Sequence, residues 1–370
     1  MIKISKKTLQ DLEYKSVVEQ IAELNVTSLG KTKILNTVPF SNRNEVIRSL
    51  NLTNEFLTSF ENENRIPNHG FEDITKELKL IKIENNYLEI NGFRKIASCC
   101  ITSNILIKFF KKHKDYYPLL NTLSSTNVIN TIIPDAINDV IDKHGEIRNN
   151  ASDLLYTTRK SIQSVRTKVN SSFNSALSTY NSAEYLDDIR ETVMENRRVL
   201  AVKSMHRRKV KGSILGSSKT GSIVYIEPET THQHQRELNN LEFEETEEIK
   251  RILLELTSLI SVYSNYLSKC QFYLTEMDVI YAKAKYAKSI QAVLPKITET
   301  QEIYLVDAYH PLLLVSNRKE ETKTYPQTIT MTTKSRIIVI SGPNAGGKSI
   351  TLKTVGLLQL MVQSGMLIPV

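Results

Sequence analysis

The sequence predicts a mainly α-helical chain that carries a small inserted β element and then enters the first part of an α/β domain. Apolar residues recur at helical spacing through most of the first 290 residues. Between residues 198 and 226 this period gives way to short apolar runs separated by turn residues, which is typical of strands. A β-branched run at 337–340 then precedes a glycine-rich segment and another helical pattern. These three patterns define the predicted fold class.

Residues 1–133 are predicted to form one helical domain. Apolar residues repeat every three or four positions up to Gly30, which ends the first pattern. Further helical patterns cover residues 46–60 and 72–123. We therefore expect several helices that share one core.

Residues 134–229 are predicted to be an insertion with its own architecture. Residues 152–180 place apolar side chains in a narrow stripe on an otherwise polar helix, which indicates contact with a single partner helix. Short strands are expected at 198–203, 212–216 and 222–226. Because these strands lie between helices, we expect a coiled-coil-like arm with the β element at its tip.

Residues 230–293 are predicted to be helical again, and their first part is rich in glutamate. An unbroken helix of this length would extend about 90 Å, since each residue adds about 1.5 Å. Such a helix would act as a strut between distant parts of the protein. Two or three shorter core helices are the alternative, because typical helices are short.

Residues 294–370 are predicted to begin an α/β domain. Strands are expected at 301–306 and 328–331, with a His-Pro turn between them. The apolar run at 337–340 is expected to be a buried parallel strand that leads directly into the glycine-rich turn.

The glycine-rich turn has the form G-x-x-x-x-G-K-S of a phosphate-binding P-loop. Glycines allow backbone N–H groups to face phosphates, and the N-terminus of the following helix adds partial positive charge. We expect Lys348 to reach the β- and γ-phosphates of ATP, and the Ser349 hydroxyl to bind Mg²⁺. A chance glycine-rich loop is the alternative. The predicted ATP-binding residues of this loop are Gly342, Pro343, Asn344, Ala345, Gly346, Gly347, Lys348 and Ser349.

The net charge of +8 is unevenly distributed. Residues 143–211 contain fourteen Lys and Arg against seven Asp and Glu, so nearly all of the excess positive charge lies there. A basic block of this kind indicates a polyanion partner such as nucleic acid. An ordinary solvated helix surface is the alternative interpretation.

The composition argues against several other classes. The three cysteines, Cys99, Cys100 and Cys270, are expected to be small buried hydrophobes rather than a disulfide framework. His232 and His234 are interpreted as part of a solvated helix face, so no zinc site is predicted. The sequence lacks both a long apolar run and a signal peptide, and we expect a cytoplasmic protein without membrane contact.

The P-loop resembles that of the MutS family of DNA mismatch-repair ATPases, which reads G-P-N-x-G-G-K-S/T. Pro343 and Asn344 supply this narrower form. The His310-Pro311 turn is similar to the entry of the family's ATPase domain, although Tyr309 stands where many members have Arg. The resemblance runs from about residue 8 to 370 and favours the second bacterial subfamily, which lacks the mismatch-reading domain. Similarity to that subfamily's clamp and returning lever lies at 198–203, 210–212, 222–228 and 237–240.

The resemblance implies an ATP-dependent DNA-damage sensor that dimerises through its ATPase domains and encircles DNA. It implies a domain order of helical core and lever (1–133), inserted clamp (134–229), returning lever (230–293) and the N-terminal part of the ATPase (294–370). His310 is the candidate adenine contact, with a packing role as the alternative. Contacts to the DNA backbone are expected from Arg197, Arg198, Lys203, Arg207, Arg208, Lys209 and Lys211.

In this family the Walker B carboxylates and the dimer interface would follow Val370. We therefore expect a fragment or a truncated product that binds ATP poorly and does not hydrolyse it efficiently. The chain carries no mismatch wedge, so branched or recombination intermediates are the expected DNA rather than mispairs. Two alternatives stay open, namely an ATPase-inactive DNA-binding or scaffold protein, and an RNA- or ribosome-associated ATPase fragment.

Overall fold

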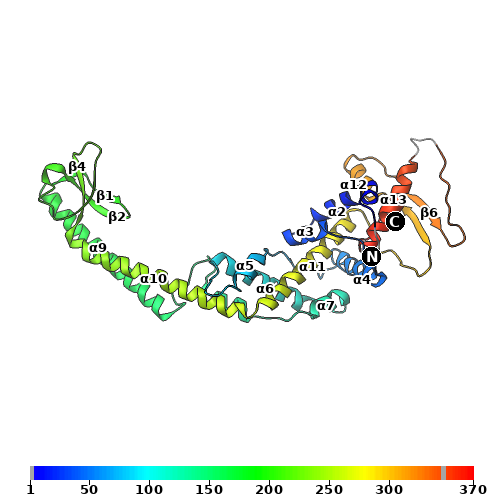
Figure 1. Ribbon diagram of the computed structural model, residues 1–370, viewed down its shortest axis with the longest axis horizontal. Coiled ribbons are helices and arrows are strands. Elements are labelled where there is room, and N and C mark those ends of the chain that lie inside the picture. The colour runs from blue at the N-terminus through cyan, green and yellow to red at the C-terminus, as the bar shows by residue number, and fades with distance from the viewer. Residues whose placement is uncertain (1–3, 343–346) are drawn as a thin grey trace. The chain divides into compact units, whose positions relative to one another are not determined.

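The computed structural model describes residues 4–342 and 347–370, and the chain divides into two compact units (Figure 1). The first unit contains Met1–Glu84, Asn91–Asp135 and Ile260–Val370. The second unit contains Asn85–Ile90 and Ala136–Leu259. The chain is mainly helical with small antiparallel sheets, as the sequence predicts. The bounds of the four predicted domains remain predictions.

Most of the first unit is built from short and medium helices. Polar side chains start several of them; for example, Thr27 accepts a hydrogen bond from Gly30 N at 3.0 Å and so caps α3. The helices are α1 (Lys6–Asp11), α2 (Tyr14–Ala22), α3 (Ser28–Leu35), α4 (Arg43–Thr58), α5 (Thr75–Leu80), α6 (Ile90–Lys112), α7 (Pro118–Ser125), α11 (Ser264–Ser289), α12 (Pro311–Lys319) and α13 (Lys348–Gln363). Helix α8 (Ile132–Val140) begins in this unit and ends in the second one.

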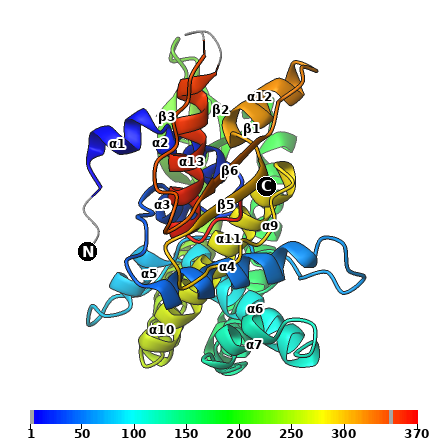
Figure 2. The same cartoon turned by 90° about the vertical axis from the view of Figure 1, so that its right-hand side faces the viewer.

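One apolar core joins both ends of the chain in this unit. It combines side chains of α2, α3 and α4 with the end of α11, and α13 lies beside these helices (Figure 2). Leu357, Leu358 and Met361 of α13 are almost completely buried in it. The second half of the predicted P-loop helix is therefore part of the helical core.

The only sheet described in this unit is β5 (Ile303–Ala308) paired antiparallel with β6 (Gln327–Met331). Both strands fall where the sequence predicts them. The His-Pro turn between them differs from the prediction, because Pro311 occupies the first turn of helix α12 and His310 precedes it. Proline suits this position, since its missing N–H has no partner in the first helical turn.

The buried parallel strand predicted at 337–340 does not form. These residues lie outside every described strand, and Ile337 and Val339 are 83% and 85% exposed. A parallel strand needs paired neighbours and helices on both faces before its apolar side chains are buried. Among the described residues, β5 and β6 supply neither, so the start of an α/β P-loop domain is not confirmed.

The second unit consists of a four-stranded antiparallel sheet and a pair of long helices, α9 (Asp153–Ser182) and α10 (Glu229–Ser261). The strand order is β1-β2-β4-β3, formed by Leu186–Met194, Arg197–Lys203, Ile223–Pro228 and Gly212–Ser217 respectively. Strands β2, β3 and β4 match the predicted ones, whereas β1 was not predicted. A short 3₁₀ turn, η1 (Ser204–His206), follows β2.

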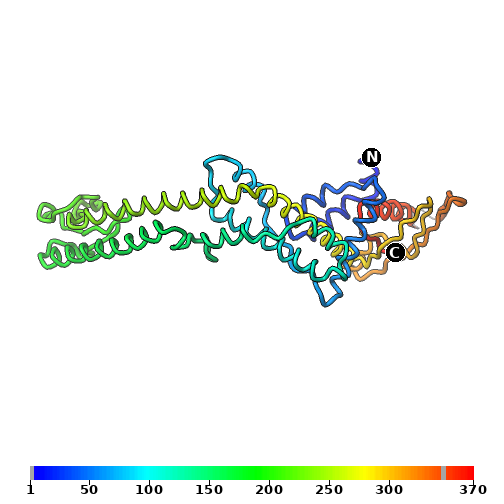
Figure 3. Tube along the Cα trace, turned by 90° about the horizontal axis from the view of Figure 1, so that it is seen from below, coloured from blue at the N-terminus to red at the C-terminus, as the bar shows by residue number. Residues whose placement is uncertain are grey.

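Helix α9 has the features that the sequence predicts. Ser152 caps it by accepting a hydrogen bond from Leu155 N at 3.0 Å. Its narrow apolar stripe contacts α10 through Ile162, Val165 and Leu238, and the two helices run side by side (Figure 3). Nearer the sheet, Phe173 packs into a core formed by β1, β2 and β4.

The predicted helical strut at 230–293 consists of two helices rather than one. Helix α10 spans 33 residues and α11 spans 26, with Val262 and Tyr263 between them. This outcome lies between the two alternatives, because both helices are much longer than an average helix.

Candidate functional site

The predicted ATP loop borders the N-terminus of α13. The helix begins at Lys348, and Gly347 precedes it with φ +82°, a left-handed conformation that favours glycine. Among the described residues, no side chain caps this end of the helix. Helix N-termini of this kind present backbone donors and partial positive charge, which suits an anion.

Besides Gly347, the structure describes three residues of the predicted ATP loop, namely Gly342, Lys348 and Ser349. The side chain of Lys348 donates a hydrogen bond to the carbonyl of Gly342, so the two ends of the loop are close together. Ser349 is exposed in the first turn of α13. The other four predicted loop residues, Pro343, Asn344, Ala345 and Gly346, lie outside the described residues.

His310, the predicted adenine contact, is 5% exposed and lies near α13. Burial lowers the pKa of this imidazole; to a smaller extent the negative charge of Glu13 raises it and the positive charge of Lys353 lowers it. Glu13 and Lys353 form an ion pair at 3.2 Å. The His310 Nδ1 atom is buried without a hydrogen-bond partner in the part of the chain that the structure describes. A neutral, buried histidine with an unsatisfied nitrogen fits a ligand contact as well as packing.

The opposite end of α13 is held by two buried side chains. Lys283 of α11 donates to the Ser364 carbonyl at 2.7 Å. The Tyr14 hydroxyl is hydrogen-bonded to the Ser364 hydroxyl at 2.6 Å. A cation suits this position, since the carbonyls at the C-terminal end of a helix carry partial negative charge. Lys283 could not be predicted as a functional residue from the sequence, because a lysine among apolar residues on a helix gives no local signal of its role.

In the second unit, five of the seven predicted DNA contacts gather around η1. The turn is held in place because Ser204 N donates to Ser222 O at 2.9 Å and its hydroxyl donates to Gly221 O at 2.5 Å. The exposed cations at the end of β2 and in the segment that follows it are Lys203, Arg207, Arg208, Lys209 and Lys211. We call these five residues the basic tip.

Aromatic side chains support the basic tip. The Tyr185 ring lies 4.8 Å from the His206 ring, and the Lys209 ammonium lies 5.2 Å from the centre of Tyr185. The backbone N–H of Lys211 donates to the Tyr180 hydroxyl at 3.2 Å. These tyrosines could not be predicted as part of the tip, because they are separated from it in the sequence and meet it only in the fold.

The remaining two predicted DNA contacts, Arg197 and Arg198, are engaged within the protein. Arg197 donates to the buried carboxylate of Glu227 at 3.0 Å. Arg198 donates to Glu191 at 2.6 Å and stacks over the Phe173 ring at 4.2 Å. Each side chain is about one third exposed, so both have a structural role before any partner is considered.

Part of the positive charge counted from the sequence is neutralised by α10. Arg159 and Arg166 of α9 pair with Glu245 and Glu242 at 2.6 and 2.8 Å. Residues 229–259 hold eight acidic residues against three Lys and Arg, which offsets much of the basic stretch. The arm is therefore a partly charge-paired helix hairpin, in which Lys160 and Lys168 of α9 also stay exposed, and five further exposed cations lie together at the tip.

The three cysteines are buried and free, and burial raises the pKa of the Cys99 and Cys100 thiols. Within the described ranges no group of three or more His, Cys, Asp or Glu could hold a metal ion. No described helix is both long enough and apolar enough to span a bilayer.

Comparison with known proteins identifies related sequences along the whole chain. No protein-family model matches. The chain is 32% identical over 371 residues to an Endonuclease MutS2 of Pediococcus pentosaceus, covering 99% of this chain and 46% of that protein. It is 31% identical over 366 residues to the Endonuclease MutS2 of a Geobacillus species, covering 98% of this chain and 46% of the relative. For the Endonuclease MutS2 of Alkaliphilus oremlandii the identity is 29% over 368 residues.

The chain spans about half the length of the curated relatives that it matches. The similarity covers 98 to 99% of the chain and therefore extends over both units. From these matches we conclude that the chain belongs to the MutS family, in its MutS2 subfamily.

Proposed function

We propose that this chain supplies the ATP-binding loop and a DNA-contacting tip of a MutS-type DNA-repair or recombination protein. The observation that carries the proposal is the group of five exposed cations at the basic tip, none of which forms an ion pair with a described residue, whereas Arg159 and Arg166 of α9 are paired. The cations lie on a turn that backbone hydrogen bonds hold in one shape. Phosphate oxygens of a nucleic acid are the natural partners of such a surface.

DNA is the proposed partner because the related proteins are named endonucleases of the MutS2 type. The tip offers charges and no base-reading element, so contact with the backbone of duplex or branched DNA is proposed rather than sequence recognition. In the whole protein we propose a homodimer that holds DNA between clamps.

The N-terminus of α13 supports the proposal of ATP binding. It combines a left-handed glycine, an uncapped helix end and Lys348 beside Gly342. These residues would hold the phosphates of ATP, and Ser349 would bind its Mg²⁺. The exposed, unpaired run at 337–340 favours a second candidate function, in which this chain binds DNA without hydrolysing ATP.

Salt dependence of DNA binding tests the proposed tip. Five exposed cations predict that the logarithm of affinity falls with the logarithm of salt concentration with a slope of about −4 to −5. Arg207→Gln with Arg208→Gln should reduce this slope by about 2. Lys269→Gln, which changes an exposed lysine of α11, is the matched control and should leave it unchanged. Affinity that is independent of salt would contradict the assignment of the tip.

Nucleotide binding is tested separately with Lys348→Ala. Titration with a fluorescent ATP analogue should show binding to the unmodified chain and a loss of at least tenfold in the variant, since the cation faces the phosphates. DNA binding should be retained. Equal binding by both proteins would contradict the loop assignment, and DNA binding without any ATP binding would support the second candidate function. Competition with RNA would distinguish an RNA-associated protein.

A further inference from the structure

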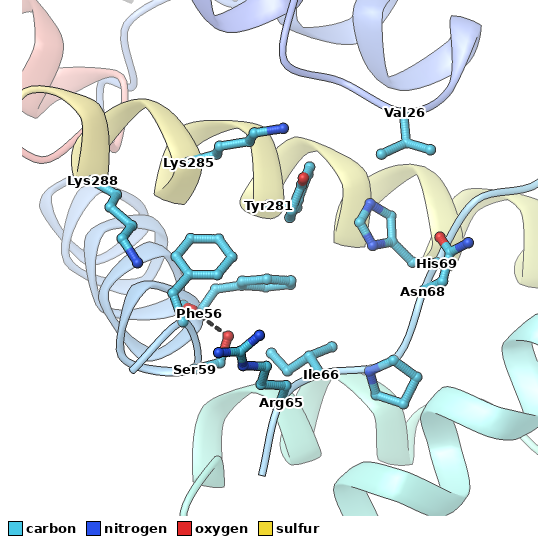
Figure 4. A pocket seen from close by; sticks show the side chains of 12 residues that line it. Val26, Phe56, Ser59, Arg65, Ile66, Asn68, His69, Tyr281, Lys285 and Lys288 are labelled. Carbon is cyan, nitrogen blue, oxygen red and sulfur yellow. Dashed lines mark hydrogen bonds between the residues drawn. The ribbon is translucent and has the colours of Figure 1, made fainter. Parts of the chain in front are cut away.

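A pocket with an aromatic floor opens in the first unit, and its volume is about 440 Å³ (Figure 4). It lies between α4, α11 and the segment at 65–69. Phe56, Phe60, His69 and Tyr281 form its floor, with neighbouring ring centres 4.8 to 6.3 Å apart. Phe60 and Tyr281 are only partly buried, so ring surface remains accessible.

Three cations surround this aromatic floor. The Lys285 ammonium lies 5.3 Å from the centre of the Tyr281 ring, and the Lys288 ammonium lies 5.4 Å from that of Phe60. Arg65 borders the pocket from the opposite side (Figure 4). No Asp or Glu is among the described lining residues, so the pocket combines positive charge with ring faces.

Hydrogen bonds hold the wall of the pocket in place. The buried carboxylate of Asp278 accepts from His69 Nε2 at 3.1 Å and from Val26 N at 2.9 Å. The buried Tyr117 hydroxyl donates to the Asn64 carbonyl at 2.6 Å, next to Arg65. Two lining segments far apart in sequence are thus tied to α11 through one carboxylate, and the cavity is preformed.

We propose that this pocket is a second nucleotide site, which binds a nucleoside 5′-phosphate. The base would stack on the Tyr281 ring, with the nearly perpendicular Phe60 ring against its edge, and the phosphate would contact Arg65, Lys285 and Lys288. The volume suits one small planar ligand with an anionic group, and it is far too small for a duplex. None of the lining residues belongs to the P-loop, so this proposal goes beyond the proposed function.

A free mononucleotide and an unstacked nucleotide at the end of a single strand offer this same chemistry. Titration of the whole chain with AMP and CMP at low salt measures binding, and Lys348→Ala serves as the background so that the P-loop contributes nothing. Saturable binding of one nucleotide per chain is expected. A 5′-phosphorylated thymidine oligonucleotide that displaces AMP would identify a strand end as the source, whereas one that fails to compete would identify the free nucleotide.

Variants separate the stacking contribution from the electrostatic one. Tyr281→Leu should weaken AMP binding about tenfold, because a base stack is lost. Lys285→Ala with Lys288→Ala should weaken it about tenfold and flatten its salt dependence. These lysines are exposed, so their replacement leaves the fold intact even where Tyr281→Leu disturbs it. Lys269→Ala on the same helix is the control and should bind AMP normally.

Three results would overturn the proposal. The first is the absence of saturable binding up to about 10 mM AMP, because a dissociation constant above that concentration is weaker than any useful affinity. The second is unchanged affinity in the double lysine variant. The third is inorganic phosphate that competes as well as AMP, because the aromatic floor would then contribute nothing.

Discussion

Replacing the buried Lys283 by methionine should remove a large pH dependence of stability. Its ammonium donates to Ser364 O at 2.7 Å and lies 3.4 Å from the Ser49 hydroxyl. It forms no ion pair with a carboxylate anywhere in the described part of the chain. Burial therefore lowers the pKa of Lys283 from 10.5 to about 8, and repulsion from Lys33 adds to this effect.

The sign of the effect follows from proton binding. Between pH 8 and 10.5 the unfolded chain keeps the Lys283 proton while the folded chain releases it. Stability rises with pH wherever the unfolded state binds more protons. One pKa unit corresponds to about 1.4 kcal/mol, so the whole interval corresponds to about 3 kcal/mol. The stabilisation of the folded chain by proton release from Lys283 is complete above pH 10.5 and is lost as the pH falls to 8.

The assay compares urea unfolding of the native chain and Lys283→Met between pH 7 and 10, followed by far-ultraviolet circular dichroism. The free energy of unfolding of the native chain, relative to the variant, should rise by about 2 to 3 kcal/mol over this range. Ionisation of tyrosines affects both proteins equally and cancels in the difference. Lys269→Met, at an exposed position of the same helix, should show no such trend. A constant difference between native chain and Lys283→Met would refute the reasoning.

Three further measurements address other parts of the structure. In urea titrations, Gly365→Ala should lower the free energy of unfolding by more than about 2 kcal/mol, because Gly365 has φ +67° and an added Cβ would lie 2.0 Å from Ser49 Oγ. The control is Gly221→Ala, since Gly221 has φ +70° but lies in open space. This variant should lower the free energy of unfolding by only about 1 kcal/mol. Arg197→Ala should destabilise the second unit by about 2 kcal/mol in urea, because it leaves the buried Glu227 unpaired, and an equal effect of Arg207→Ala would contradict this distinction. The three buried cysteines should react with iodoacetamide at pH 8 only after unfolding, since their raised pKa values disfavour the thiolate. Rapid labelling of the folded chain would contradict this prediction, because it would show that the thiols are accessible.

Local patterns predicted much of the secondary structure correctly. The helix expected at 152–180 is α9, Asp153–Ser182, because its apolar stripe and its cap lie within the segment itself. Strand β1 was missed, since Leu186–Met194 is rich in charge and contains an irregularity in its pairing with β2. Such a strand at the edge of a sheet depends on its neighbour more than on its own composition.

The candidate sites were predictable to different degrees. The loop around Lys348 is recognisable because its glycines, lysine and serine are adjacent in the chain. The basic tip was only partly predictable, since the count of charges could not distinguish Arg207, which is exposed, from Arg197, which pairs with Glu227. That distinction depends on which strand lies beside which.

The sequence by itself determined the P-loop motif, the mainly helical class and the MutS resemblance, because each of these is written in residues that are close together along the chain. The tertiary structure decided which charges remain exposed, how Lys283 holds the end of α13 and where an aromatic pocket forms. It also decided that the apolar run at 337–340 stays unpaired. The physical reason is common to all four: burial, ion pairing and strand pairing are properties of neighbours in space, and these neighbours are far apart in the sequence.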